Sequence, residues 1–417
     1  MPHGNLGQKL HQDLFPARLS NFVSGNQVTL LQCGQAYFPA IEASFDRARH
    51  EIYLETYIFE NDVTGRRIAD ALKRAALRGV NVYMLIDGYG SKGLPRSMPD
   101  SLGAAGVKIL IFRPGISPWT FRRMRLRRLH RKIAVVDRDI AFVGGINIID
   151  DSKSPGELPP RYDYAVAVEG PLVEKIRLST RRLWSMVSWS RFRKGTAHDR
   201  ALPVSTFTGG RMNAAFLVRD NFRHRRDIEA AYMQAIEQAT SEIILAHAYF
   251  FPGLDFRHAL IDAAGRGVRV VLLLQGRADH FVQHYASRAL YGNLLDAGIE
   301  IYEYQKSLLH AKVAVIDGHW ATIGSSNLDP FSLLLSREAN VVVDDKEFGA
   351  TLTQSLKLTM ETDAPRIFSD SWKHQSVGLR FMSWLSYGLV RLMMGISGYN
   401  RDNSRHGKAR TSAPDRV

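Results

Sequence analysis

The sequence has very little cysteine: Cys33 is the only one among 417 residues. A single thiol excludes an internal disulfide and fits a reducing compartment. The chain contains neither a CxxC pair nor an HExxH pattern, so it predicts no metal site, and we expect no cofactor. Its first 15 residues, MPHGNLGQKLHQDLF, lack an apolar stretch long enough for a secretory signal. We therefore expect the protein to stay in the compartment where it is made.

Acidic residues are also scarce. There are 41 Asp and Glu residues against 55 Lys and Arg, which gives a formal net charge of +14. No acidic residue lies between Asp100 and Asp137. Within that gap, PWTFRRMRLRRLHRK (118–132) interleaves arginines with Trp, Phe, Met and Leu. Such a run suits nucleic acid strands and anionic lipid surfaces alike, and a solvated loop is the third interpretation.

What the chain does have is internal repetition. LHRKIAVVDRDIAFVGGIN (129–147) recurs as LHAKVAVIDGHWATIGSSN (309–327). Five positions match at a constant offset of 180 residues: His130 and His310, Lys132 and Lys312, Asp137 and Asp317, Gly144 and Gly324, Asn147 and Asn327. One copy is compatible with a β-hairpin that has a polar end. Two copies at one offset indicate a duplicated functional unit.

The repetition extends upstream of the motif. Three pairs of segments are similar: HEIYLETYIF (50–59) and SEIILAHAYF (241–250), ALKRAALRGVNVYMLID (71–87) and ALIDAAGRGVRVVLLLQ (259–275), AAGVKILIF (104–112) and DAGIEIYEY (296–304). Short β-branched runs alternate with segments of helical spacing, and Gly79 is a candidate helix C-cap. The pattern predicts two tandem α/β/α domains related by pseudo-twofold symmetry, with mostly parallel or mixed sheets flanked by helices.

Four regions are expected: an N-terminal extension (1–26), a first domain (27–205), a second domain (206–365) and an amphipathic tail (366–417). The join is placed within 194–213, where periodicity fails and Gly, Pro and Thr accumulate.

The tail contains SVGLRFMSWLSYGLVRLMMGISGY (376–399). On a helical wheel, one narrow stripe is polar and the rest is apolar; the stripe consists of Arg380, Ser383, Tyr387 and Arg391. Two arginines make an in-plane interfacial helix a better interpretation than a membrane span. A helix packed on the protein's own core is the alternative.

Each motif sets an imidazole beside a cation. Side chains two apart share a strand face, so His130 is expected to point with Lys132, and His310 with Lys312. One imidazole can attack phosphorus while the other protonates the leaving oxygen, and the lysines can stabilise the charge. A phosphodiester is the natural occupant of such a pocket.

The remaining polar positions complete the prediction. Asp137 and Asp317 come at the hairpin turns, a position that by itself needs no catalysis. The returning strands present small residues, then Asn147 and Asn327 as further donors. Aligning RYDYAVAVEG (161–170) with SREANVVVDD (336–345) matches Asp163 to Glu338. Each carboxylate is expected to orient the histidine of its own half, a solvated charge at a strand start being the alternative.

The doubled H-x-K-x4-D-x6-G-x2-N pattern resembles the phospholipase D superfamily over most of residues 27–345. LETYIF, LHRKIAVVD, FVGGIN and DYAVAVEGP resemble the bacterial cardiolipin synthases of the shorter type that lacks N-terminal membrane helices. This resemblance implies phosphatidyl transfer between two phosphatidylglycerol molecules through a phosphohistidine, with release of glycerol, by a peripheral protein on the cytoplasmic face of the bacterial inner membrane.

The resemblance also implies residue roles. The catalytic set is His130, Lys132, Asp137, His310, Lys312 and Asp317; the phosphate-binding set is Asn147, Asn327, Gly145 and Ser325; the histidine-orienting pair is Asp163 and Glu338. The Gly145 and Ser325 pair breaks the symmetry, because the first half lacks the hydroxyl. The arginine-rich approach to His130 favours that residue as the nucleophile and His310 as the acid and base.

Three functions fit these features. A lipid phosphatidyltransferase accounts for the motifs, the charge and the tail. A phospholipase D-type phosphodiesterase or nuclease accounts for the motifs and charge but leaves the tail unexplained, and a non-catalytic lipid-binding scaffold accounts only for the charge and tail. We therefore expect an anionic phospholipid and a membrane surface as partners, and not nucleic acid; the sequence does not indicate an oligomeric state.

Overall fold

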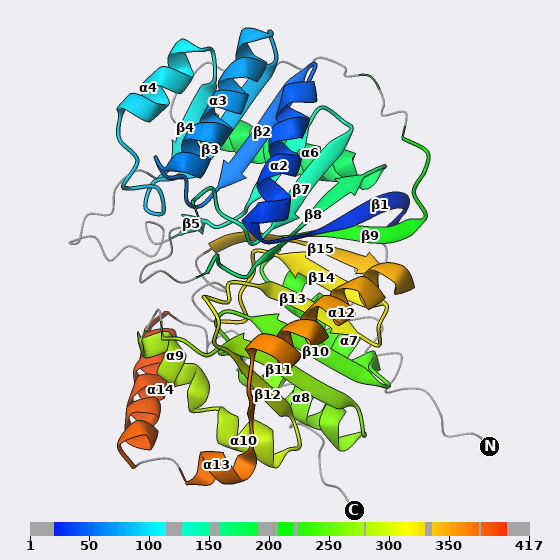
Figure 1. The fold of residues 1–417 in the computed structure, drawn as a ribbon, viewed down its shortest axis with the longest axis vertical. Coiled ribbons are helices and arrows are strands. Elements are labelled where there is room, and N and C mark those ends of the chain that lie inside the picture. The colour runs from blue at the N-terminus through cyan, green and yellow to red at the C-terminus, as the bar shows by residue number, and fades with distance from the viewer. Residues whose placement is uncertain are drawn as a thin grey trace, which may run out of the picture.

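The structure is a computed structural model that describes residues 21–113, 127–150, 159–190, 203, 207–220, 224–278, 281–329, 336–374 and 377–397. Two α/β halves lie one above the other (Figure 1). Most of the expected join, and residues 118–126 of the basic run, fall outside the described residues.

The first half alternates strands with helices as the repeat predicts. Its elements are β1 (Val23–Gln32), α2 (Cys33–Arg47), β2 (Glu51–Thr56), α3 (Val63–Leu77), β3 (Asn81–Asp87), α4 (Ser97–Ala104), β4 (Lys108–Phe112), β5 (Arg128–Leu129), β6 (Ile133–Val136), β7 (Ile140–Gly144), β8 (Tyr164–Glu169) and α6 (Leu172–Trp189). The strand β1 begins four residues before the expected domain start at residue 27.

The second half repeats this order. Its elements are β9 (Met212–Arg219), α7 (Asp227–Gln238), β10 (Glu242–His247), α8 (Leu254–Gly265), β11 (Arg269–Gln275), α9 (Phe281–Arg288), α10 (Tyr291–Asp296), β12 (Glu300–Tyr304), β13 (Lys312–Ile316), β14 (Trp320–Gly324), β15 (Ser336–Asp344) and α12 (Lys346–Asp363), followed by β16 (Arg366–Ile367), α13 (Ser369–Lys373) and α14 (Val377–Ser397). Because β16 pairs with β12, the first residues of the expected tail belong to this sheet.

One mixed sheet runs through both halves. Among the described residues its order is β16-β12-β11-β10-β13-β14-β15-β9-β1-β8-β7-β6-β2-β3-β4, and β5 pairs separately with β15. Apart from the additional edge strand β16, the order is equivalent on the two sides of the antiparallel contact of β1 with β9. Only β2-β3-β4 and β10-β11-β12 are parallel within this path. The predicted pseudo-twofold α/β architecture is confirmed, and the two sheets are continuous.

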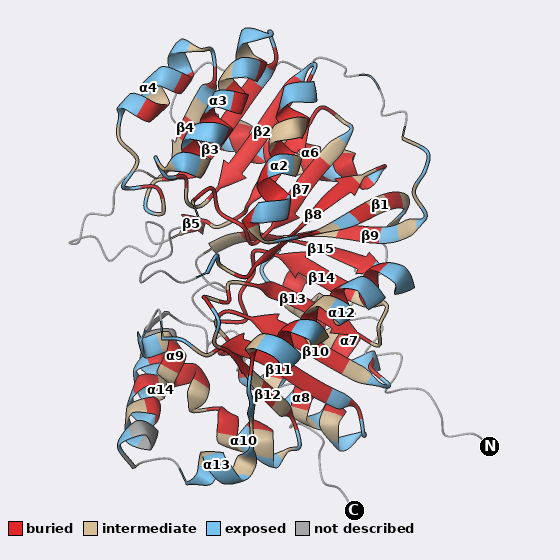
Figure 2. Cartoon of the chain, in the orientation of Figure 1, coloured by how far each residue is buried: buried red, intermediate tan, exposed pale blue. Residues whose placement is uncertain are grey.

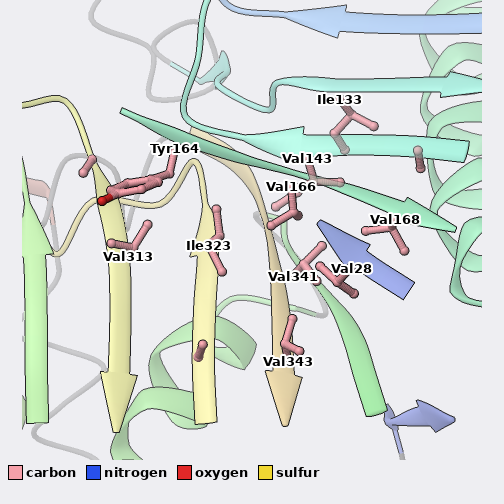
Figure 3. Packing of buried hydrophobic residues seen from close by; sticks show 14 of the residues in the cluster. Val28, Ile133, Val143, Tyr164, Val166, Val168, Val313, Ile323, Val341 and Val343 are labelled. Atoms are coloured by element: carbon pink, nitrogen blue, oxygen red, sulfur yellow. The ribbon is translucent and has the colours of Figure 1, made fainter. Parts of the chain in front are cut away.

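Helices cover both faces of the sheet, so the central strands are buried on both sides and read as apolar runs. The helices α2, α3 and α4 pack on one face of the first half. The core beneath α6 continues beneath α12, and Figure 3 shows Val143 and Val166 of the first half close to Val341 of the second. Buried residues follow the strands while exposed ones line the outer faces of the helices (Figure 2). This shared core holds the two motif-bearing hairpins together.

The helix-ending glycine is where the sequence places it. Gly79 has φ +90, and the Val80 N–H donates to the Ala75 carbonyl at 3.1 Å. This is the Schellman arrangement, in which glycine avoids the Cβ strain of the left-handed region. The helix α3 therefore ends at the predicted position, and β3 follows it directly.

Candidate active site

The backbone of each motif is tied to the opposite half. The His130 N–H donates to the Arg337 carbonyl at 3.0 Å, and the His310 N–H donates to the Tyr162 carbonyl at 2.8 Å. His130 and Lys132 lie between β5 and β6, so the first motif is not the uninterrupted strand that the spacing suggests. In the second half, β13 begins at Lys312.

The orienting carboxylates cross between the halves. The Nδ1 atom of His130 lies 3.0 Å from both carboxylate oxygens of Glu338, and Nδ1 of His310 lies 2.6 Å from Oδ2 of Asp163. The expectation that each carboxylate serves the histidine of its own half is therefore wrong. The reason is that β15 and the chain before β8 run beside the opposite motif. Because each Nδ1–H donates to a carboxylate, Nε2 of each imidazole is left for chemistry.

The two motif lysines are buried cations. Lys132 is 2% exposed and Lys312 is fully buried. The Nζ of Lys132 donates to the His130 carbonyl at 2.8 Å, and Nζ of Lys312 donates to the His310 carbonyl. Each lysine thus holds the backbone of its own histidine; that the two side chains point the same way stays a prediction.

Gly145 and Ser325 contact the carboxylates, which corrects their expected place on the phosphate. The Ser325 hydroxyl donates to Oε2 of Glu338 at 2.6 Å. At the equivalent position, a Cβ on Gly145 would lie 2.6 Å from Oδ2 of Asp163. In the second half a hydroxyl supports the carboxylate, and in the first half the carboxylate fills that space. The asymmetry seen in the sequence therefore belongs to the support of the histidines.

Asn147 and Asn327 follow the returning strands β7 and β14 and are each 5% exposed. The Oδ1 atom of Asn147 accepts the Ile58 N–H at 3.2 Å. This contact fixes the amide, so its NH2 group is the part able to donate to an anion. Binding of phosphate by both asparagines stays a prediction.

Asp137 and Asp317 lie at the opposite ends of their strands from the motif lysines, so their expected catalytic role is corrected. Both have positive φ, 54 and 50, at the hairpin turns. Asp137 accepts the N–H groups of residues 49–51 at 2.8 to 2.9 Å. Asp317 accepts the N–H groups of residues 240–242 at 2.8 to 3.0 Å. Each aspartate anchors a hairpin tip to the start of the neighbouring strand, a structural function.

One contact of the site escaped the sequence reasoning. The ring of Tyr57 meets the His130 ring edge-on at 4.9 Å, and Lys132 Nζ lies 5.4 Å from the Tyr57 ring centroid. The repeat indicates this difference between the halves, because Tyr57 in LETYIF aligns with Ala248 in LAHAYF. The environment of His130 therefore has an aromatic wall that the His310 motif does not share at this position.

Burial dominates the electrostatics of the site. It lowers the pKa of Lys132 to about 7 and that of Lys312 to about 8, because a desolvated ammonium is disfavoured. Burial also lowers the pKa of His130, and that of His310 more strongly. It raises the pKa of Asp163 to about 6.

The halves also act on each other electrostatically. Lys312 lowers the pKa values of His130 and Lys132, and Lys132 lowers that of His310. The two lysines and two histidines thus form one cluster at the interface, in which a bound anion would offset the mutual repulsion of the cations. In the part of the chain that the structure describes, no group of three or more His, Cys, Asp or Glu residues is placed to hold a metal ion.

Known proteins share this duplicated organisation. A family model described as "Cardiolipin synthase, PLD-like domain" matches residues 41–175 and 232–359, one match in each half. Cardiolipin synthase B of Escherichia coli (strain K12) is 40% identical over 352 residues, which cover 82% of each chain. Cardiolipin synthase A of Yersinia pestis bv. Antiqua (strain Angola) is 31% identical over 338 residues, covering 80% of this chain and 69% of that one.

Among solved structures, a phosphatidylserine synthase of Haemophilus influenzae Rd KW20 superposes with a TM-score of 0.68, covering 93% of this chain and 98% of that one. At 13% identity this likeness concerns the fold alone. The family match in both halves and the 40% identity over most of the length carry the assignment. The chain belongs to the cardiolipin synthase family of the phospholipase D superfamily and is an enzyme.

Proposed function

We propose that the protein synthesises cardiolipin by transferring a phosphatidyl group from one phosphatidylglycerol to another through a phosphohistidine. The observation that carries the proposal is the pair of interface histidines, each with Nδ1 held by a carboxylate of the other half. The names of the relatives at 40% and 31% identity support the lipid product. We place the enzyme at the cytoplasmic face of the bacterial inner membrane. None of the described helices is long and apolar enough to cross a bilayer.

The first half-reaction forms the covalent intermediate. With its Nδ1–H on Glu338, neutral His130 carries its lone pair on Nε2 and attacks phosphorus of the first phosphatidylglycerol. The bond from phosphorus to the headgroup glycerol oxygen breaks as the P–N bond forms. His310, protonated on Nε2 and held by Asp163, gives that proton to the glycerol oxygen, and glycerol leaves.

The second half-reaction returns the enzyme to its starting state. Neutral His310 removes the proton from a headgroup hydroxyl of the second phosphatidylglycerol. The alkoxide oxygen attacks phosphorus, the P–N bond breaks, and its electron pair returns to Nε2 of His130. Protons and charge balance over the cycle, with two phosphatidylglycerols consumed and one cardiolipin and one glycerol formed.

The lysines supply the charge stabilisation. Their burial lets them act on the phosphate oxygens through a medium of low dielectric. Burial lowers the pKa values of both histidines, and the positive charges of the lysines lower them further because they disfavour a neighbouring imidazolium. Arrival of the phosphodiester anion restores the proton that His310 needs as an acid.

The choice of His130 as nucleophile follows from the basic approach to the first motif. Arg128 is part of it, 4.0 Å from Asp87, and precedes the motif directly. The pKa shifts favour the opposite assignment, because His310 is the more strongly lowered of the two and a low pKa favours the neutral nucleophile. Acid-quenching turnover of radiolabelled phosphatidylglycerol and mapping the labelled peptide decides between them; label on the His310 peptide alone would reverse the roles.

The proposed activity is tested with purified protein and phosphatidylglycerol liposomes, followed by thin-layer chromatography for cardiolipin and an assay for free glycerol. We expect both products in equal amounts, and expect His130→Ala and His310→Ala each to abolish them. The exposed His258 in α8 gives a matched control, so His258→Ala should retain full activity. Phosphatidic acid as the sole lipid product would indicate a hydrolase, and cleavage of single-stranded DNA without lipid turnover would indicate a nuclease.

A further inference from the structure

The helices α9 and α14 pack side by side (Figures 1 and 2). Several large apolar side chains on these two helices are exposed. We call this group the apolar face. It consists of Phe281 and Val282 on α9 and Phe381, Trp384, Leu385, Leu389 and Leu392 on α14. Their exposed fractions run from 37% for Val282 to 69% for Trp384. The five residues on α14 stand at positions 381, 384, 385, 389 and 392, a spacing that places them on one side of the helix. Exposed apolar side chains gathered in this way on a folded protein mark an interaction site.

The helix α14 buries little apolar surface compared with an ordinary surface helix: Val390, 3% exposed, joins the core of the second half. Its inward residues include small polar ones, since Ser383 is 6% exposed and Ser386 is 5% exposed. Tyr387 is half-buried, and its ring lies 5.4 Å from that of Phe251. Of the polar stripe expected from the sequence, Ser383 and Tyr387 therefore face the protein while Arg391 is exposed, and the large apolar residues face outward.

The apolar face lies at the same edge of the sheet as the second motif. Phe251, which contacts α14, donates its N–H to the Leu328 carbonyl at 2.8 Å, one residue after Asn327. Gln275, at the end of β11, accepts the Leu309 N–H at 2.7 Å, directly before His310. The helix α9 begins six residues after Gln275. A partner on this face would lie on the side of the second half that carries the second motif.

Charge indicates which partner fits. The helix α14 contains no acidic residue between 377 and 397, and Arg391 on it is exposed. A pocket next to α14 is lined by Arg257, Arg288 and Trp384. Arg288 is paired with Glu303 at 3.0 Å, so Arg257 and Arg391 are the cations that border the apolar face. Apolar and aromatic side chains bordered by cations match the interface of an anionic bilayer.

We propose that the apolar face docks the enzyme on an anionic bilayer, so that the His310 motif is brought near the lipid headgroups. The inference rests on the proposed function for the lipid class of the substrate. It goes further in making the folded pair of α9 and α14 the docking element, in place of a free amphipathic tail. A second copy of the chain is the competing occupant, and the experiment below separates the two.

The test compares two triple variants of the full chain. One is Trp384→Ser, Leu385→Ser, Leu392→Ser on the apolar face. The matched control is Val63→Ser, Leu77→Ser, Trp189→Ser, which removes side chains that are 56%, 76% and 82% exposed in the first half. The measurements are flotation with phosphatidylglycerol-containing vesicles, turnover of those vesicles, and turnover of a short-chain, monomeric phosphatidylglycerol.

We expect the apolar-face variant to lose vesicle binding and vesicle turnover by at least about tenfold, because each removed side chain contributes apolar burial. Turnover of the monomeric lipid should stay near wild type, and the control variant should match wild type in all three measurements. Undiminished vesicle binding by the apolar-face variant would overturn the docking proposal. If the wild type turned over neither lipid, the proposed function itself would be overturned instead.

Two further measurements keep the test independent of folding. Trp384→Phe retains an apolar side chain, so we expect wild-type binding but less quenching of tryptophan fluorescence by brominated lipids. Equal quenching in both proteins would mean that Trp384 does not reach the bilayer, against the proposal. Sedimentation should show the same oligomeric state for wild type and the apolar-face variant. Conversion of a dimer to a monomer, with vesicle binding intact, would assign the face to a second copy.

Discussion

Replacing Gly145 with alanine should lower activity by displacing Asp163, the carboxylate that holds His310. The added Cβ would lie 2.3 Å from Oδ1 and 2.6 Å from Oδ2 of Asp163, whereas ordinary contact begins at 3.4 Å. The two oxygens must therefore withdraw by about 1.1 Å and about 0.8 Å, and a shift of this size disrupts the 2.6 Å hydrogen bond between Oδ2 and Nδ1 of His310. Misplacement on this scale costs about a hundredfold in turnover, so we expect kcat to fall by about that factor.

The assay is cardiolipin formation from phosphatidylglycerol, with thermal unfolding measured in parallel. Gly103 in α4 provides the control, because a Cβ there meets nothing within 4 Å. Gly103→Ala should leave kcat unchanged. In an Asp163→Asn background the Gly145→Ala effect should shrink toward nothing, since both changes remove the same interaction. Wild-type kcat in folded Gly145→Ala protein, or full additivity of the two substitutions, would refute the reasoning.

Two further predictions concern pH and stability. The pH profile of kcat/KM should be bell-shaped. Activity should be lost as pH falls through about 6, because Asp163 with its raised pKa becomes protonated, and as pH rises through 7 to 8, because Lys132 and Lys312 with their lowered pKa values lose charge. A flat profile from pH 5 to 9 would contradict this prediction. Asp317→Ala should lower the free energy of unfolding by about 2–3 kcal/mol at neutral pH, because several charge-assisted hydrogen bonds are lost, while kcat per folded molecule stays unchanged. The pKa of Asp317 is lowered, so the difference should fade in acid as the folded-state carboxylate is protonated, and denaturant titrations at two pH values check both points.

The fold and the motif residues could be read from the sequence because duplication doubles every signal. The 180-residue offset predicted two halves and a pseudo-twofold axis. The paired motifs are near enough for the lysine of each half to lower the pKa of the histidine in the other half. Helix ends such as that at Gly79 were local enough to predict from a single glycine. Joining of the two sheets through β1 and β9 was not, because edge pairing leaves no periodicity of its own.

The crossing of the carboxylates could not be predicted for a related reason. A carboxylate that follows its histidine by 28 or 33 residues can reach either motif, and spacing does not distinguish the two. Only the short pairing of β5 with β15, which brings residue 337 beside Leu129, decides that Glu338 serves His130. Likewise, a small residue beside a phosphate and one beside a buried carboxylate look alike in sequence, which explains the correction for Gly145 and Ser325.

Because the carboxylates are crossed, the site is complete only when both halves of the chain are folded and in contact. A chain that has folded only its first half holds His130 without Glu338, and one that has folded only its second half holds His310 without Asp163. Neither half possesses an activated imidazole of its own. On the proposed mechanism, a nascent, truncated or half-unfolded molecule therefore lacks activity, and phosphodiester chemistry begins only after both halves have packed against each other.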